Sequence, residues 1–240
     1  MLHKRVGNAL HSSATAPAHL GLIPDGNRRW ARRHGLSLLN GYHNGIDRFI
    51  SFSMWAKRLG VKTITVWALS TENIKNRSRT EVRMLYSLYM RAAKDPKLLA
   101  LLVKNRARIM IVGNLSMLPS NLRETLRALE AKTMGCSELT INLLIGYGGK
   151  DDIMHATCVA ARARSRVGEA GFSKGLRSSA LPDVDLVIRT SGEHRLSGFL
   201  PWQTDYAELY FTRKYWPEFN RRDLKRAIDS YSSRERRFGK

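Results

Sequence analysis

Residues 19–30 read HLGLIPDGNRRW, an apolar run that ends in Pro-Asp-Gly and leads into a basic, helix-like segment. The apolar run predicts a buried β-strand, and the residues after Asp-Gly predict the start of a helix. Backbone N–H groups between Gly26 and Arg29 would then face an anion, assisted by the helix dipole. A carboxylate such as Asp25 beside an anion pocket is unusual unless a cation such as Mg²⁺ lies between them. The alternative is an ordinary Asp-Gly turn in which Asp25 caps the helix.

Further along the chain, short apolar runs alternate with helix-like segments. Strands are predicted at 19–23, 62–69, 107–112, 139–145 and 184–188. Helices are predicted at 43–59, 80–103, 120–134, 150–165 and 221–231. This alternation indicates crossover connections and a largely parallel sheet within one α/β domain. Residues 1–17 lack periodicity, so we expect a flexible N-terminal arm before a domain that spans 18–240.

Polar and glycine-rich residues follow several predicted strands, at 25–27, 70–73, 146–149 and 189–192. Ligands bind at the carboxyl edge of open parallel sheets, so these segments predict a site as well as a fold. The segment 189–197, RTSGEHRLS, combines two arginines and three hydroxyl side chains around one glycine. Forked guanidinium groups and hydroxyl donors suit a diphosphate. Glu193 lies between the arginines, where it either orients them or forms a purely structural salt bridge.

The composition favours an anionic partner. Lys+Arg number 41 and Asp+Glu 20 in 240 residues, which gives a formal charge of +21. Nucleic acid, an anionic membrane surface and a phosphorylated small substrate all reward such a charge. Cys136 and Cys158 lack the spacing of a disulfide scaffold or a zinc site, so a reducing, cytoplasmic location is expected. No secretory leader and no apolar run of membrane-spanning length is recognised.

Several common catalytic motifs are absent from the sequence. It contains no GxxxxGK[ST] loop, no GxGxxG fingerprint and no HExxH helix, which argues against the common nucleotide-binding and zinc enzymes. It also lacks the DDxxD helix of trans-type prenyl synthases. The pair Asp151-Asp152 stands at a predicted helix start, where we expect a mainly structural role.

Ordered blocks of the sequence resemble the cis-prenyltransferases, the undecaprenyl diphosphate synthase-like Z-isoprenyl diphosphate synthases. The blocks are 19–31, 70–73, 147–153, 189–197, 207–212, 216–219 and 234–239. The resemblance implies a Mg²⁺-dependent transferase of prenyl groups in isoprenoid and polyprenyl diphosphate biosynthesis, which condenses an allylic prenyl diphosphate with isopentenyl diphosphate and releases diphosphate. It also implies a homodimer and a single α/β domain: a central, mostly parallel six-stranded sheet flanked by helices, with a hydrophobic prenyl cleft.

The resemblance further implies roles for individual residues. The catalytic residues would be Asp25, Asn27 and Asn73, and the metal ligands Asp25 and Glu208. The allylic diphosphate would be bound by Gly26, Asn27, Arg28, Arg29, Tyr42, His43 and Arg77. The acceptor diphosphate would be bound by Arg189, Arg195, Ser197 and Gly239, the last completing the partner subunit's site. The cleft would be walled by Phe49, Trp55, Leu85 and Leu88, for which ordinary core is the alternative. The proton acceptor stays open among Asn27, Tyr42, His43 and a diphosphate oxygen.

Several positions depart from the family pattern around the allylic diphosphate. Pro24, the pair Arg28-Arg29 and Tyr42 are similar to the lavandulyl-type branch, which joins prenyl units in an irregular, head-to-middle way, sometimes with cyclisation. Asn27 and the segment 189–193 agree instead with regular chain elongation. Regular coupling would use isopentenyl diphosphate as acceptor, whereas irregular coupling would use dimethylallyl diphosphate. Both remain open, and we lean towards regular coupling because more polar positions are retained.

Two non-enzyme hypotheses compete with this interpretation. A basic nucleic-acid-binding protein would explain the charge, but no nucleic-acid motif is recognised, so we expect small-molecule prenyl diphosphates and no nucleic acid as partners. A noncatalytic subunit of a heteromeric synthase would keep the fold while losing catalytic residues, which the presence of Asp25, Arg189 and Arg195 argues against. Peripheral contact with a membrane is expected only if the product is long.

Overall fold

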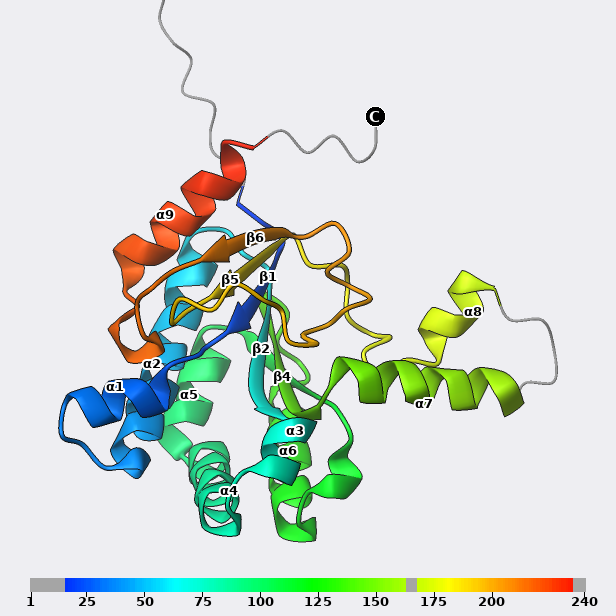
Figure 1. Ribbon diagram of the computed structural model, residues 1–240, viewed down its shortest axis with the longest axis horizontal. Helices are drawn as coiled ribbons and strands as arrows, with labels where there is room; N and C mark the ends of the chain where they lie inside the picture. The colour runs from blue at the N-terminus through cyan, green and yellow to red at the C-terminus, as the bar shows by residue number, and fades with distance from the viewer. Residues whose placement is uncertain (1–15, 163–167, 235–240) are drawn as a thin grey trace, which may run out of the picture.

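The computed structural model describes residues 16–162 and 168–234. A six-stranded sheet in the order β3-β4-β2-β1-β5-β6 lies at its centre, and every neighbouring pair of strands is parallel (Figure 1). The strands are β1 (His19–Ile23), β2 (Thr63–Ser70), β3 (Ala107–Val112), β4 (Leu139–Tyr147), β5 (Leu186–Arg189) and β6 (Glu208–Phe211). The predicted six-stranded α/β fold is thereby confirmed.

Helices lie in every connection between successive strands except that from β5 to β6, which is a loop. They are α1 (Asn27–Arg33), α2 (Leu38–Arg58), α3 (Thr71–Asn76), α4 (Arg79–Lys94), α5 (Pro96–Lys104), α6 (Ser120–Thr133), α7 (Gly149–Arg162), α8 (Glu169–Lys174) and α9 (Arg221–Ser232), with 3₁₀ turns η1 (Leu115–Met117) and η2 (Trp216–Glu218). In Figure 1, α7 and α8 project from the body of the molecule on the right. Within the described residues, no helix is both long and apolar enough to cross a membrane.

Strand β1 is buried along its whole length because both faces of the sheet are covered. Leu20 and Leu22 belong to a core cluster with side chains of α2, α5, α6 and α9, whereas Ile23 packs on the opposite face with Phe199. Gly21 lets that face close tightly, since a Cβ there would lie 2.7 Å from a ring carbon of Phe199. The apolar run that predicted a buried strand is explained by this two-sided packing.

The structure corrects several predicted boundaries. The helix predicted over 80–103 is two helices, because Pro96 begins α5 and Asp95 caps it by accepting a hydrogen bond from the backbone N–H of Lys97 at 2.8 Å. The helix predicted from 43 begins at Leu38, where the Ser37 side chain caps it. Strand β6 is missing from the predictions; all four of its residues are only partly buried, so its sequence carries a weak pattern.

Candidate active site

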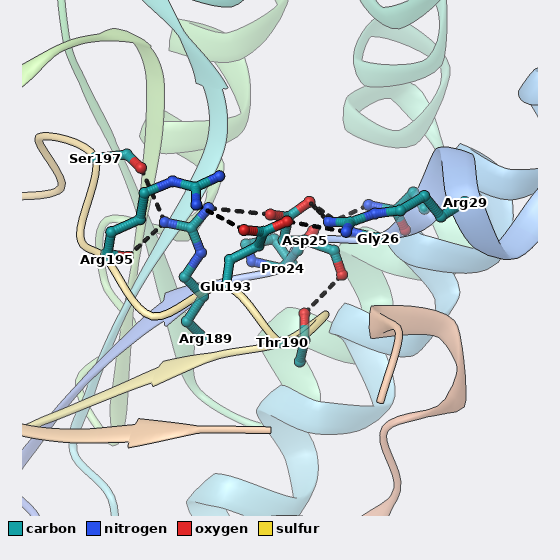
Figure 2. A network of polar contacts seen from close by, with 10 residues as sticks. Pro24, Asp25, Gly26, Arg29, Arg189, Thr190, Glu193, Arg195 and Ser197 are labelled. Atoms are coloured by element: carbon teal, nitrogen blue, oxygen red, sulfur yellow. Dashed lines mark hydrogen bonds and ion pairs between the residues drawn. The ribbon is translucent and has the colours of Figure 1, made fainter. Parts of the chain in front are cut away.

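Asp25 and Arg189 meet at the carboxyl edge of the sheet. Strands β1 and β5 are parallel neighbours in the register Ile23↔Arg189, so the residues that follow them lie side by side. The Asp25 Oδ2 atom accepts a hydrogen bond from Arg189 Nη2 at 3.0 Å, as Figure 2 shows. The Arg189 side chain is 6% exposed and that of Asp25 is 32% exposed. The ion pair is thus anchored in the core on one side and open to a ligand on the other.

The loop after β5 holds the rest of the Arg189 guanidinium. Its Nη1 atom donates to the Arg195 carbonyl at 2.5 Å and to Ser197 Oγ at 2.9 Å. Its Nε is buried and has no hydrogen-bond partner among the described residues, and the same is true of Ser191 Oγ. Ser191, Ser197 and Leu200 all adopt positive φ angles, of 81°, 55° and 41°. Such backbone conformations in non-glycine residues are often found at ligand sites.

A second group of charged side chains, from Arg29, Glu193 and Arg195, lies around Asp25. Glu193 accepts from Arg29 Nη1 at 2.9 Å and from Arg195 Nη1 at 2.6 Å, so it ties helix α1 to the loop after β5 (Figure 2). The hydrogen bonds from Arg29 and Arg195 hold the pKa of Glu193 below its ordinary value. Arg29 Nη2 also lies 3.4 Å from Asp25 Oδ1. With Arg189, three guanidinium groups surround two carboxylates, and the local surplus of positive charge suits an anionic ligand.

Asn27 lies beside this cluster, at the start of α1. Its Nδ2 donates to the Pro24 carbonyl at 3.0 Å, while its Oδ1 is buried without a hydrogen-bond partner in the part of the chain that the structure describes. A Cβ at Gly45 in α2 would lie 2.4 Å from that Oδ1 atom, so glycine is required there for the two helices to approach. Gly26 has a φ of 101°, and its N–H donates to Asp25 Oδ1 at 2.7 Å.

A cavity of about 460 Å³ opens beside these residues. Its polar end includes Asp25, Asn27, Tyr42, Asn73, Arg77, Arg189 and Ser197. Its apolar lining comes from α2, α4, α5, α6 and the central strands, and includes the predicted cleft residues Phe49 and Leu85. The other two predicted cleft residues do not line it: Leu88 is buried in a neighbouring core cluster, and Trp55 packs against the central core.

Tyr42 and Arg77 belong to a compact charged cluster at the cavity. The Tyr42 hydroxyl donates to Glu81 Oε1 at 2.7 Å and accepts from Arg77 Nη1 at 2.8 Å. Arg28 Nη1 lies 3.7 Å from the same carboxylate oxygen. Burial raises the pKa of Tyr42 well above its ordinary value, so the hydroxyl stays protonated at neutral pH. The sequence analysis missed Glu81, whose place in the first turn of α4 is typical of an ordinary helix-start carboxylate.

Among the described residues, two predicted site residues, His43 and Glu208, lie apart from both the cavity and the Asp25 cluster. The His43 side chain is 56% exposed and pairs with Asp47 at 3.2 Å, on the outer side of α2. Glu208 begins β6 opposite Leu186, at the other end of β5 from Arg189, and pairs with Arg234. Within this chain it therefore does not join Asp25. Gly239 lies outside the described residues.

The arrangement combines a diphosphate-sized cluster of guanidinium and hydroxyl donors with an apolar cavity. Within residues 16–162 and 168–234, no group of three or more His, Cys, Asp or Glu side chains is placed to hold a metal ion. Asp25 and Glu72 are the carboxylates among the described residues that line the cavity, and Asp25 is the one paired with Arg189. The geometry suits a ligand with an anionic head and a hydrocarbon tail.

Comparison with known proteins gives the same picture. A family model described as "Putative undecaprenyl diphosphate synthase" matches residues 23–239. A geranylgeranyl-diphosphate-specific tritrans,polycis-undecaprenyl-diphosphate synthase of Thermoplasma volcanium is 42% identical, covering 93% of this chain and 89% of that protein. An isoprenyl transferase of Thermus thermophilus is 39% identical with the same coverage.

Two solved structures share the fold. Lavandulyl diphosphate synthase from Lavandula x intermedia, in complex with dimethylallyl diphosphate, has a TM-score of 0.87 at 32% identity and covers 94% of this chain and 99% of its own. A probable undecaprenyl diphosphate synthase from Campylobacter jejuni has a TM-score of 0.78 at 31% identity, with coverage of 94% and 100%. The family model and these relatives extend over the site as well as the sheet, and the chain therefore belongs to the undecaprenyl diphosphate synthase family of cis-prenyltransferases.

Proposed function

We propose that this chain is a Mg²⁺-dependent cis-prenyl diphosphate synthase that condenses an allylic prenyl diphosphate with isopentenyl diphosphate and releases diphosphate. The observation that carries the proposal is the Asp25–Arg189 ion pair at the mouth of an apolar cavity. A prenyl diphosphate needs a cationic site for its head directly beside a dry site for its tail.

The length of the cavity favours regular chain elongation. Its lining on β4 extends from Ile145 near the carboxyl edge to Ile141, four residues deeper. Four residues of a strand span roughly 13 Å. A five-carbon prenyl unit extends roughly 5 Å, as follows from ordinary carbon–carbon bond lengths. The cavity therefore has room for an allylic chain of two or three units, more than a five-carbon donor needs.

The residues of the site account for the bond-breaking step. Cleavage of the allylic C–O bond leaves negative charge on the departing diphosphate, so fixed donors that face this charge lower the barrier. Arg77 lies on the cavity wall and Arg29 lies beside Asp25, and carboxylates already hold both guanidinium groups in place. Little reorganisation is then needed as the charge develops.

The same geometry positions the acceptor. Arg189 and Ser197 line the polar end of the cavity and suit the diphosphate of isopentenyl diphosphate. The acceptor's double bond would then lie near the allylic carbon, in a cavity whose apolar walls exclude water from the cationic fragment. Asn27 lines this end of the cavity, and its buried Oδ1, which has no hydrogen-bond partner among the described residues, is an acceptor that a ligand would satisfy.

The donor set at the mouth of the cavity fits Mg²⁺. This ion commonly binds through one or two carboxylates, with substrate phosphates and water completing its coordination. Asp25 offers a partly exposed carboxylate beside the predicted diphosphate site. Bound there, Mg²⁺ would neutralise charge on the leaving diphosphate. Glu208 remains a predicted ligand, although this chain alone does not bring it to Asp25.

Irregular coupling is the second candidate. The high TM-score with lavandulyl diphosphate synthase favours it, as do Pro24, Arg28 and Tyr42 around the donor site. Product analysis by mass spectrometry and NMR separates the two. Purified protein with Mg²⁺ is incubated with dimethylallyl diphosphate alone, and then with isopentenyl diphosphate plus allylic diphosphates of increasing length. Linear Z-products that require isopentenyl diphosphate are expected; a branched or cyclic product from dimethylallyl diphosphate alone would establish irregular coupling.

The proposal includes a homodimer that acts in the cytoplasm on small-molecule substrates. Met154 and Val159 on the projecting helix α7 are 61% and 42% exposed, which supports an interface with a second copy. Sedimentation analysis should give the mass of a dimer. A monomer at micromolar concentration would contradict this part of the proposal.

A further inference from the structure

We infer that Glu81 is a positioning residue of the donor site, which acts through Tyr42, Arg77 and Arg28 without touching the substrate. This inference rests on the proposed function, because it concerns the site that would bind the allylic diphosphate. Glu81 is 9% exposed and does not line the cavity, whereas Tyr42 and Arg77 do. Its contacts therefore lie behind the residues that would face the ligand.

A single oxygen of Glu81 lies close to side chains from three separate segments of the chain. Its Oε1 lies 2.7 Å from the Tyr42 hydroxyl in α2, 3.3 Å from Arg77 Nη1 in the α3–α4 connection and 3.7 Å from Arg28 Nη1 in α1. The backbone around Glu81 is itself fixed, since its N–H donates to the Ser78 cap at 3.2 Å. The carboxylate therefore has a defined position from which to orient the two arginines.

The contacts of Arg77 with Glu81 and Tyr42 both use one nitrogen of its guanidinium group. Arg77 directs Nη1 at both Glu81 and the Tyr42 hydroxyl, and its guanidinium lies 5.8 Å from the centre of the Tyr42 ring. A guanidinium has five N–H donors in a rigid fork, so fixing one nitrogen fixes the direction of the others. On this wall of the cavity, the remaining donors suit a diphosphate oxygen.

The charge balance explains why a carboxylate is needed. Arg28 and Arg77 converge on one point, and two like charges held together without a counterion repel each other. Without Glu81 the two long side chains would separate and regain rotamer freedom, which a diphosphate would then have to remove on binding. Outer groups of this kind commonly change affinity or activity 10- to 100-fold when they are removed.

The test compares Glu81→Gln with the wild type in calorimetric binding of farnesyl thiolodiphosphate, a slowly reacting allylic probe of three prenyl units. Isopentenyl diphosphate is then titrated into the loaded protein. We expect the affinity for the allylic probe to fall about tenfold or more. The affinity for isopentenyl diphosphate should stay within twofold, because Arg189 is held by Asp25 and the loop after β5 instead.

Asp152→Asn is the matched control. Asp152 is a 2% exposed carboxylate that accepts from the Ser178 hydroxyl at 2.5 Å and from the Arg177 N–H at 2.6 Å, away from the cavity. The control should lower thermal stability and leave the affinity of the folded protein for the probe unchanged. If Glu81→Gln does not fold, Glu81→Asp takes its place; it keeps the charge but draws the carboxylate back from Tyr42, Arg77 and Arg28, so it should weaken allylic binding alone.

Unchanged or tighter allylic binding in the folded variant would overturn the inference, because the carboxylate would then be neutral towards the ligand or compete with it. Equal weakening for both diphosphates would overturn it as well, since that result indicates a general structural role. The proposed function is tested separately by turnover of the wild type. A wild type that binds the probe but forms no product would refute the function and still leave the role of Glu81 to be decided by binding.

Discussion

Substitution of Asp25 by Asn should separate binding from chemistry. The change keeps the size of the side chain and removes the charge that pairs with Arg189 at 3.0 Å. Asp25 carries the same sign of charge as the departing diphosphate, so it would act on that group through the Mg²⁺ that it is predicted to hold. Loss of one principal electrostatic contact to a developing charge commonly costs 10²- to 10³-fold in kcat, or about 2.7–4 kcal/mol. We expect the upper end of this range, a fall in kcat of about 10³-fold, because the metal would be the main counter-charge at this point.

The KM for the allylic substrate should not rise in this variant. The charged cluster holds three arginines and two carboxylates, Asp25 and Glu193, so its local surplus is +1 and increases to +2 when Asp25 is neutralised. At saturating Mg²⁺ this gain of positive charge offsets the weaker hold on the metal, so diphosphate binding should be retained. A lower kcat with an unchanged KM is the signature of an interaction made only in the transition state.

Folding should survive the substitution. A hydrogen bond to a charged group contributes about 1.5–3 kcal/mol, and the lower half applies here because the Asp25 side chain is 32% exposed. A loss of about 2 kcal/mol lowers Tm by roughly 4–8 °C in a chain of this size. The assay is steady-state turnover at 25 °C with saturating Mg²⁺, beside a thermal melt and the surface control Asp229→Asn. Turnover within tenfold of the wild type would refute the assigned role of Asp25.

Three further outcomes are expected. Burial lowers the pKa of His19 from 6.5, so the unfolded chain binds a proton that the folded chain excludes and stability falls as the pH drops below about 6.5. Urea denaturation should show a slope of up to about 1.4 kcal/mol per pH unit there, and this slope should vanish in His19→Gln. Gly45→Ala should displace Asn27, 2.4 Å from the new Cβ, and reduce turnover at least tenfold, whereas Gly135→Ala, with open space around it, should not. Leu85→Trp should fill the cavity and weaken binding of a twenty-carbon allylic diphosphate more than of a ten-carbon one in a competition assay.

Much of the fold was predictable because its central strands are buried on both faces. Continuous apolar runs such as 19–23 and 139–145 carry that signal without any knowledge of tertiary structure. Strand β6 has a weaker hydrophobic pattern, since its four residues are only partly buried. The sequence Asp95-Pro96 indicates the break between α4 and α5, because a capping residue is followed by a residue that commonly begins a helix. The prediction missed this break because the apolar periodicity continues across it.

The site was predictable where a residue directly follows a strand, and less so where it lies on a helix face. Asp25 and Arg189 were placed in the site because each directly follows a predicted strand, and they meet because β1 and β5 are neighbours. Phe49 and Trp55 are six residues apart on α2, roughly 240° around the helix axis, so only Phe49 faces the cavity. Glu81 could not be singled out, because its burial arises only when α1, α2 and α4 pack together.

The positive φ angles in the loop after β5 imply that thermal stability and catalytic activity place opposite demands on this loop. Each non-glycine residue in the left-handed region costs roughly 1–2 kcal/mol. Ser191 and Ser197 carry this cost beside the Asp25–Arg189 pair, and Leu200 carries it in the core. Glycine at Ser197 would relieve it and remove the hydroxyl that holds Arg189. A search for heat-resistant variants would therefore favour Ser197→Gly, a substitution that we expect to impair the enzyme because it removes a contact to Arg189.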